Sequence, residues 1–247
     1  MNKKIVIAAL SVMFLLNACK KETDNFSLTP VDSYNPLVVG KYITYQMDSL
    51  VFINFGIQQA IHSYQVKYQV DGTLTDALNR KAYRIVRYIR NTPSDAWVPD
   101  NTFMSVNTNH SMEFMENNMR FIKLSLPIQN GFSWKGNSFI ETSSINSDVK
   151  YMADWDYTYD SVNMPITLGT FSLDSTIKVN QRDEYIGGDV TDINTLYAEK
   201  NYGVEKYARN IGMVYKNFVH WEYQRPSPGS SFSYTGFGIT LTMIDHN

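Results

Sequence analysis

The stretch that decides the fold is DWDYTYD, at residues 154–160. Its aromatic residues, Trp155, Tyr157 and Tyr159, alternate with aspartates and a threonine, so the two kinds of side chain lie on opposite faces of an extended chain. Aromatic residues also favour strands. The stretch therefore predicts a strand that buries its aromatic face and exposes its acidic face to water.

The same period of two recurs along the chain in segments rich in Tyr, Val, Ile and Thr. It predicts further strands at 42–53, 63–70, 82–90, 176–183, 213–223 and 237–244. Between them, Asn117-Asn118, Asn130-Gly131 and Gly187-Gly188 are turn-forming pairs, and the proline-containing stretches 92–101 and 225–231 predict loops. The expected fold is all-β, an antiparallel meander with few short helices. Its body is a barrel, open or closed, or a sandwich.

Two stretches, at 140–152 and 196–208, fit either a helix or a strand. The domain organisation is simpler, because one β-rich domain over residues 34–247 accounts for all the predicted strands. A weak two-meander organisation within it, joined near 120–127, remains an alternative.

Composition excludes several classes of protein. With 43% hydrophobic residues the chain can bury a substantial core. Its 22 Lys and Arg against 24 Asp and Glu give a net charge of −2. That charge argues against nucleic acid as a partner, since binding phosphates needs a concentrated basic surface. A single cysteine excludes a disulfide framework, a CxxC redox centre and a cysteine-based zinc site.

The amino terminus has the three-part layout of an export signal. Lys3 and Lys4 precede an apolar run at 5–16, and LNAC follows at 16–19. The run makes about 18 Å of helix against about 30 Å of hydrocarbon, too short for a permanent span. We predict a signal peptide at residues 1–18.

The sequence LNAC also resembles the bacterial lipobox, although Asn17 is unusual at its position. The resemblance implies a diacylglyceryl group on the Cys19 sulfur, cleavage before that residue, and acylation of the new amino terminus, for example by palmitate. The membrane is then a partner through the diacylglyceryl-cysteine.

Lys20 in place of Asp favours the outer membrane. The charged segment 20–24 resembles the export tag of surface-exposed Bacteroidota lipoproteins, so both the periplasmic and the exposed face remain open. Residues 19–33 are expected to form a flexible tether.

Several segments together resemble a group of uncharacterised outer-membrane lipoproteins of the Bacteroidota. They are the lipobox, the strand entry YNPLVVGKY at 34–42 with Asp48-Ser49 after it, WKGN at 134–137, and YARNIGMVY at 207–215. Ile43 departs from the Trp that is common at that position in the group. The resemblance implies no activity, so it supplies no catalytic residue.

Candidate sites are few. The histidines are far apart, so no zinc-helix motif exists, and we expect neither a metal nor a cofactor. Asp154, Asp156 and Asp160 form the most suggestive acidic set, because alternate carboxylates on one face of a strand could bind Ca²⁺. The simpler interpretation, which we favour, is the wet face of the strand described above.

Two further sets of residues are candidates for binding and modification. Trp97, Trp134 and Trp221 could stack on sugar rings or line an apolar pocket, or they could belong to the core. Ser49, Ser161 and Ser175 each follow Asp in a triplet that looks like the O-glycosylation acceptor of this phylum.

The sequence thus favours a lipid-anchored envelope protein with a non-catalytic binding or scaffolding role, whose partner is an envelope protein, a lipid or a glycan. The alternative is a lipid- or glycan-binding carrier module, and the third hypothesis is a hydrolase that uses acidic residues. A binding module should show a concave cavity or an exposed aromatic strip, whereas a scaffold should show a flat apolar patch.

Overall fold

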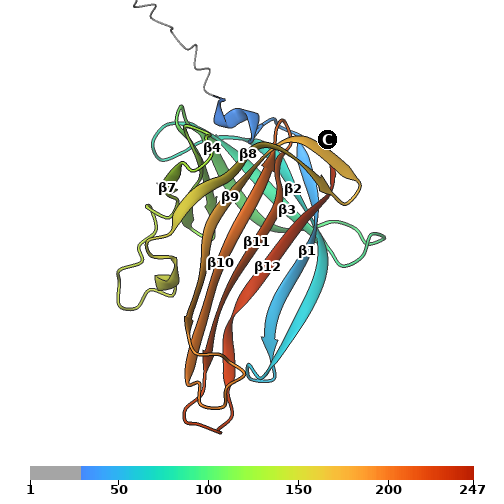
Figure 1. The fold of residues 1–247 in the computed structure, drawn as a ribbon. Coiled ribbons are helices and arrows are strands. Elements are labelled where there is room, and N and C mark those ends of the chain that lie inside the picture. Colours follow the sequence, from blue (N-terminus) through green and yellow to red (C-terminus); the bar gives the residue numbers. More distant parts are fainter. Residues whose placement is uncertain (1–28) are drawn as a thin grey trace, which may run out of the picture.

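The computed structural model describes residues 29–247, which form one antiparallel sheet of twelve strands (Figure 1). The strands are β1 (Tyr42–Ile53), β2 (Gln58–Thr75), β3 (Lys81–Arg90), β4 (Val98–Asn107), β5 (Ser111–Glu116), β6 (Met119–Ser125), β7 (Ser133–Lys135), β8 (Asp156–Leu168), β9 (Phe171–Gly187), β10 (Tyr197–Ala208), β11 (Gly212–Gln224) and β12 (Ser233–His246). Helical structure in the described residues is limited to two 3-10 turns, η1 (Val31–Ser33) and η2 (Lys150–Met152).

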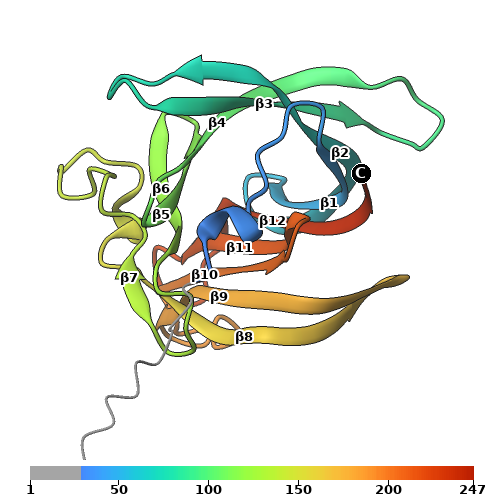
Figure 2. The ribbon, with the colours of Figure 1, turned by 90° about the horizontal axis from the view of Figure 1, so that it is seen from above.

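The sheet curls into a nearly closed barrel (Figure 2). Its order is β6-β5-β4-β3-β2-β1-β12-β11-β10-β9-β8-β7, so two consecutive meanders join where β1 pairs with β12. The connection between the meanders follows Ser125 and ends before Ser133. The predicted all-β antiparallel meander is confirmed, and its form is a barrel.

The two edges of the sheet, β6 and β7, meet at a seam. The Ile122 N–H donates to the carbonyl of Gly136 at 2.8 Å, and the indole N–H of Trp134 donates to the carbonyl of Ile122 at 2.8 Å. The Tyr159 hydroxyl donates to the carbonyl of Ser125 at 2.8 Å and accepts from its N–H at 3.0 Å. These contacts satisfy edge groups that would otherwise be free to pair with another chain.

The alternation that predicted the fold is confirmed in β8 and just before it. Trp155, Tyr157 and Tyr159 are at most 1% exposed, and they pack in the largest core cluster. The open stretch 196–208 is almost entirely strand β10, and 140–152 is irregular apart from η2. The predicted loop at 92–101 was too long, because β4 begins at Val98. Pro99 is tolerated there beside a β-bulge opposite Arg87 and Tyr88.

The segment before β1 closes one end of the barrel (Figure 2). Val31 and Tyr34 are buried, and the Tyr34 hydroxyl donates to Asn163 Oδ1 at 2.8 Å. The carbonyl of Ser33 accepts from the N–H of Asn210 at 2.7 Å. Residues 19–28 of the predicted tether, 19–33, lie outside the described residues. The last part of the tether, residues 29–33, packs against the barrel. We call this end proximal, and the end formed by the β1–β2 and β11–β12 turns distal.

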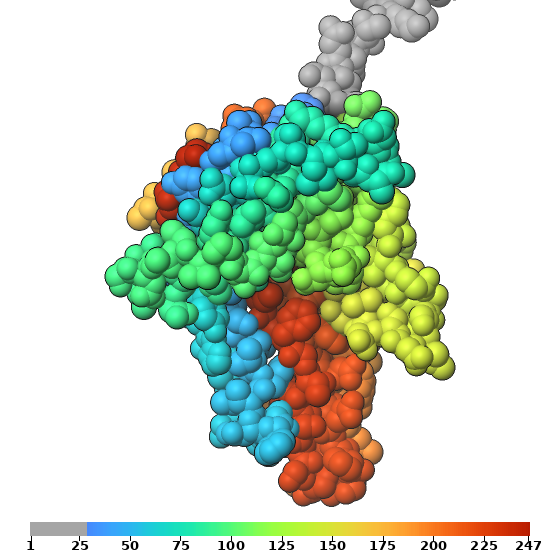
Figure 3. All heavy atoms as spheres, turned by 180° about the vertical axis from the view of Figure 1, so that it is seen from behind, coloured from blue at the N-terminus to red at the C-terminus, as the bar shows by residue number. Residues whose placement is uncertain are grey.

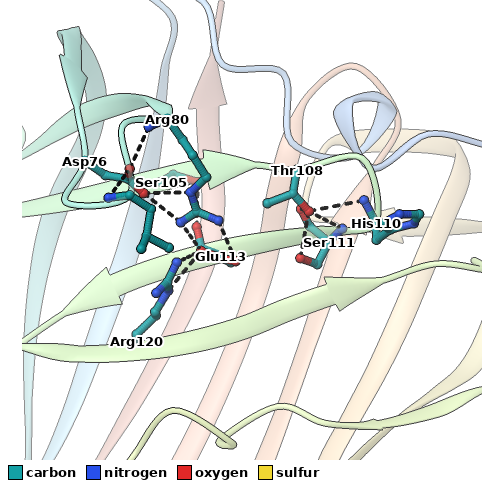
Figure 4. A network of polar contacts seen from close by, with 9 residues as sticks. Asp76, Arg80, Ser105, Thr108, His110, Ser111, Glu113 and Arg120 are labelled. Atoms are coloured by element: carbon teal, nitrogen blue, oxygen red, sulfur yellow. Dashed lines mark hydrogen bonds and ion pairs between the residues drawn. The ribbon is translucent and has the colours of Figure 1, made fainter.

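A polar cluster holds the β2–β3 turn against β5 and β6 (Figure 4). The Glu113 carboxylate, 5% exposed, accepts from Arg80 Nη2 at 2.7 Å and from Arg120 Nε at 2.9 Å. Arg80 also donates through Nε to Asp76 at 2.8 Å. Every charge in this cluster has a partner, so its role is structural.

Candidate ligand site in the barrel interior

The barrel interior holds two cavities. The proximal cavity, of about 90 Å³, lies beneath the segment Asn35–Leu37. The distal chamber, of about 280 Å³, lies between β3–β6 and β11–β12. Four residues line both cavities: Tyr68, Glu116, Lys123 and Lys216. The interior is therefore divided by a charged layer.

We call Glu116, Lys123, Glu205 and Lys216 the ionic belt. Lys123 Nζ donates to Glu205 Oε1 at 2.8 Å, and Lys216 Nζ donates to Glu116 Oε1 at 3.3 Å. The Tyr207 hydroxyl donates to Glu205 Oε2 at 2.6 Å. The side chains of Lys123 and Glu205 are 7% and 1% exposed, so this ion pair is almost fully removed from water. The belt carries equal numbers of positive and negative groups, which makes its burial tolerable.

Burial and neighbouring charges act in opposite directions on Glu205, Glu116 and Lys123. Burial by itself would raise the pKa of the Glu205 carboxyl, but Lys123 and Lys216 hold that pKa below its ordinary value. Glu116 behaves in the same way. Burial would lower the pKa of the Lys123 ammonium, yet Glu205 and Glu116 raise it. All three groups are thus charged at neutral pH.

The distal chamber is lined by both apolar and polar side chains. Its apolar lining is mainly aromatic and aliphatic: Phe103, Met119, Phe121, Met152, Trp155, Phe218, Phe237, Ile239 and Leu241. Gln181 also lines it, is 3% exposed, and its amide nitrogen has no hydrogen-bond partner within residues 29–247. A buried amide without a partner is costly. Its position on a cavity wall points to a group that the cavity receives.

The chamber opens toward the distal end. Figure 3 shows part of β11 and β12 uncovered below β4–β6. Phe237 is 40% exposed although it lines the chamber, and its ring stacks on Phe218 at 5.6 Å between centroids. An apolar surface therefore leads from the opening to the interior.

A polar pocket on β9–β11 shares Tyr151 with the distal chamber. The Tyr151 ring stacks on His220 at 3.6 Å between centroids, and His220 Nδ1 lies 2.8 Å from Asn201 Oδ1. Burial lowers the pKa of the His220 imidazole, which favours its neutral form. Asn201 in turn donates to Glu199 at 2.6 Å. The partners fix the imidazole, so we regard this group as a support for Tyr151.

The three predicted tryptophans do not converge on one surface. Trp134 lies on β7 and packs on Tyr159 at 4.6 Å between centroids. Trp97 lies before β4, between Lys67 and Arg90. Trp221 lies on β11 against Tyr185 and Tyr234. None of the three lines the proximal cavity or the distal chamber, so a ligand role for any of them remains a prediction.

The acidic set follows the simpler interpretation. Asp156 and Asp160 are exposed and pair with Lys135 and Lys178, and the Asp154 side chain is 94% exposed. Within residues 29–247 no three His, Cys, Asp or Glu side chains are grouped so that they could hold a metal ion. Asp156 and Asp160 form the wet face of β8, whereas Asp154 precedes that strand with a positive φ of 55°.

The remaining predicted residues concern modification and anchoring. Ser49, Ser161 and Ser175 are half-buried positions on β1, β8 and β9, and their glycosylation stays a prediction. Cys19 and the signal peptide lie outside the described residues. No helix between residues 29 and 247 has the length and hydropathy to cross a bilayer.

Sequence reasoning missed the ionic belt and Gln181. One signal could have shown part of the belt, because Lys123 shares a strand face with Phe121, and Glu205 shares one with Tyr207. A charge at an apolar position of an alternating strand indicates a buried, paired group. The partner of each charge, however, depends on how the barrel closes.

Comparison with known proteins gives only distant likenesses. No family model matches the chain, and no curated protein matches its sequence. Among solved structures, a protein assigned as exported, with a YmcC-like fold, from Bacteroides fragilis NCTC 9343 shares 10% identity with a TM-score of 0.37, over 84% of this chain and 97% of the other. A protein assigned as a lipoprotein from Parabacteroides distasonis ATCC 8503 shares 10% identity with a TM-score of 0.31, over 85% and 96%. Lipovitellin, in a study of its lipid–protein interactions, shares 12% identity with a TM-score of 0.37, over 85% of this chain and 26% of lipovitellin. Likenesses this weak carry no argument about function.

Proposed function

We propose that the protein is a non-catalytic binding module of the cell envelope whose barrel takes up the apolar part of a small ligand. The observation that carries this proposal is the distal chamber, an apolar cavity with an opening and an unpartnered buried amide on its wall. Ligand sites combine mostly apolar walls with a few convergent polar groups, in volumes of about 300–1,000 Å³. The chamber lies just below that range, which suits a small or partly inserted ligand.

The chamber favours a carrier over a scaffold. A scaffold needs an accessible apolar patch, whereas the apolar side chains of the chamber line a recess. A glycan would need coplanar exposed aromatics, while the chamber aromatics face its interior. We therefore propose a carrier whose ligand has lipid character.

Filling the chamber tests this proposal. In the chain carrying Cys19→Ala, the neutral probe N-phenyl-1-naphthylamine should bind with increased fluorescence. Ile239→Trp should weaken that binding at least tenfold, because the indole side chain is larger than that of isoleucine and fills part of the chamber. Thr240→Trp is the control, since residue 240 is adjacent on β12 but does not line the chamber. Absence of probe binding, or equal loss in both variants, would overturn the proposal.

The envelope location is proposed from the amino-terminal sequence. We infer an outer-membrane lipoprotein anchored through Cys19, with palmitate among its acyl groups, because several acyl chains make a stable anchor. Cells grown with radiolabelled palmitate should label the wild-type chain and leave Cys19→Ala unlabelled. Labelling that persists in Cys19→Ala contradicts the anchor.

A further inference from the structure

We propose that the distal chamber selects an anionic aliphatic ligand, an alkanoic acid whose carboxylate meets the belt lysines and Gln181 while its chain runs toward the opening. This inference rests on the proposed function and names its ligand class. Three observations carry it: the charges on the chamber wall, the spare donors among them, and the apolar path to the opening.

More basic than acidic side chains line the chamber, although Arg87 is paired with Asp100 outside it. Its ionisable basic residues are Arg87, Lys123 and Lys216, and its only carboxylate is Glu116. Glu205, the partner of Lys123, lines the proximal cavity instead. A ligand in the chamber therefore faces more positive than negative groups, which favours an anion.

The polar groups on the wall also have unused donors. An ammonium group carries three N–H bonds, yet within residues 29–247 Lys123 and Lys216 each donate one hydrogen bond. The Gln181 amide nitrogen donates none and is buried. Unpaired buried donors are best satisfied by a ligand group that only accepts hydrogen bonds. An ionised carboxylate is such a group.

The ligand needs one charge and one apolar chain. Among anions, a monoanion adds the least charge to a buried site. From the belt, Phe218, Phe237 and Ile239 provide an apolar wall along β11 and β12 toward the distal end. An alkyl chain laid along this wall would cover the exposed part of Phe237.

Competition against the neutral probe tests the inference. In the Cys19→Ala chain, decanoate should displace N-phenyl-1-naphthylamine at a concentration at least tenfold lower than 1-decanol or decyltrimethylammonium does. The three compounds share one chain and differ in the head group. Equal displacement by all three overturns the anionic selectivity but leaves the proposed function intact, whereas a probe that never binds refutes the proposed function itself.

Gln181→Leu separates binding from folding. The substitution removes donors that serve no partner in the protein, so thermal unfolding should not shift downward. Decanoate binding should weaken about tenfold or more, the loss expected for one hydrogen bond to a charged group, while decanol binding stays unchanged. Asn180→Leu, which also replaces an amide by leucine but at an exposed position of β9 that does not line the chamber, is the control. Unchanged decanoate affinity in Gln181→Leu contradicts the role of Gln181.

Discussion

Lys123→Met should lower the free energy of unfolding by about 3–5 kcal/mol at neutral pH, the cost of leaving a buried charge without its partner. The substitution leaves the Glu205 carboxylate, 1% exposed at its side chain, with only the Tyr207 hydroxyl and the more distant Lys216. Methionine matches the length of the lysine stem, so lost packing contributes little. Urea unfolding followed by far-ultraviolet circular dichroism measures the change.

A second substitution shows whether the unpaired charge is the cause. Lys123→Met with Glu205→Gln removes both charges and keeps an acceptor for Tyr207, so it should recover most of the lost stability. Lys178→Met, which breaks the partly exposed pair with Asp160, is the control and should cost less than about 1 kcal/mol. If the double variant is no more stable than Lys123→Met, the loss comes from packing and the belt is not an electrostatic unit.

The sequence predicted local structure well where one face of a strand is buried. The residues of β1, 42–53, were predicted to the residue, because alternation and turn residues bound that strand on both sides. Strands β4 to β7 were missed. Strand β4 contains Pro99, and β5 and β6 are short. Strand β7, Ser133–Lys135, extends over too few residues to show a period. Such strands form because neighbouring strands pair with them, and pairing is not a local property.

The candidate site depends still more on non-local contacts. Lys123 and Glu205 are 82 residues apart in sequence and meet only because the sheet curls until β6 faces β10. Glu205 and Lys216 are cross-strand neighbours on β10 and β11, but nothing in the sequence shows that their face is the inside of a barrel. The alternation of each strand predicts which residues share a face. Curvature and closure decide what that face encloses.

Trp134→Ala has the second large expected effect, a loss of about 3 kcal/mol or more in the free energy of unfolding, typical of removing an aromatic side chain from a core. Trp134 packs against Phe132, Tyr157 and Tyr159, and its indole N–H donates to the Ile122 carbonyl at the seam. The substitution therefore removes packing and opens the contact between β6 and β7. Chemical denaturation gives the magnitude, and Trp134→Phe separates the two contributions because it keeps a ring but loses the hydrogen bond, at a cost of about 1–3 kcal/mol.

The same variants decide between the two roles of Trp134. As a seam residue it should affect stability and leave ligand binding alone, since Trp134 does not line the distal chamber. Trp134→Phe should therefore be less stable than the wild type and bind N-phenyl-1-naphthylamine with unchanged affinity. Trp97→Ala should cost less than Trp134→Ala, because Trp97 loses chiefly its cation–π contacts with Lys67 and Arg90, each worth about 0.5–1 kcal/mol at an exposed site. A Trp134→Phe chain that keeps its stability and loses the probe would instead make Trp134 a ligand platform, and the chamber would then extend to the seam.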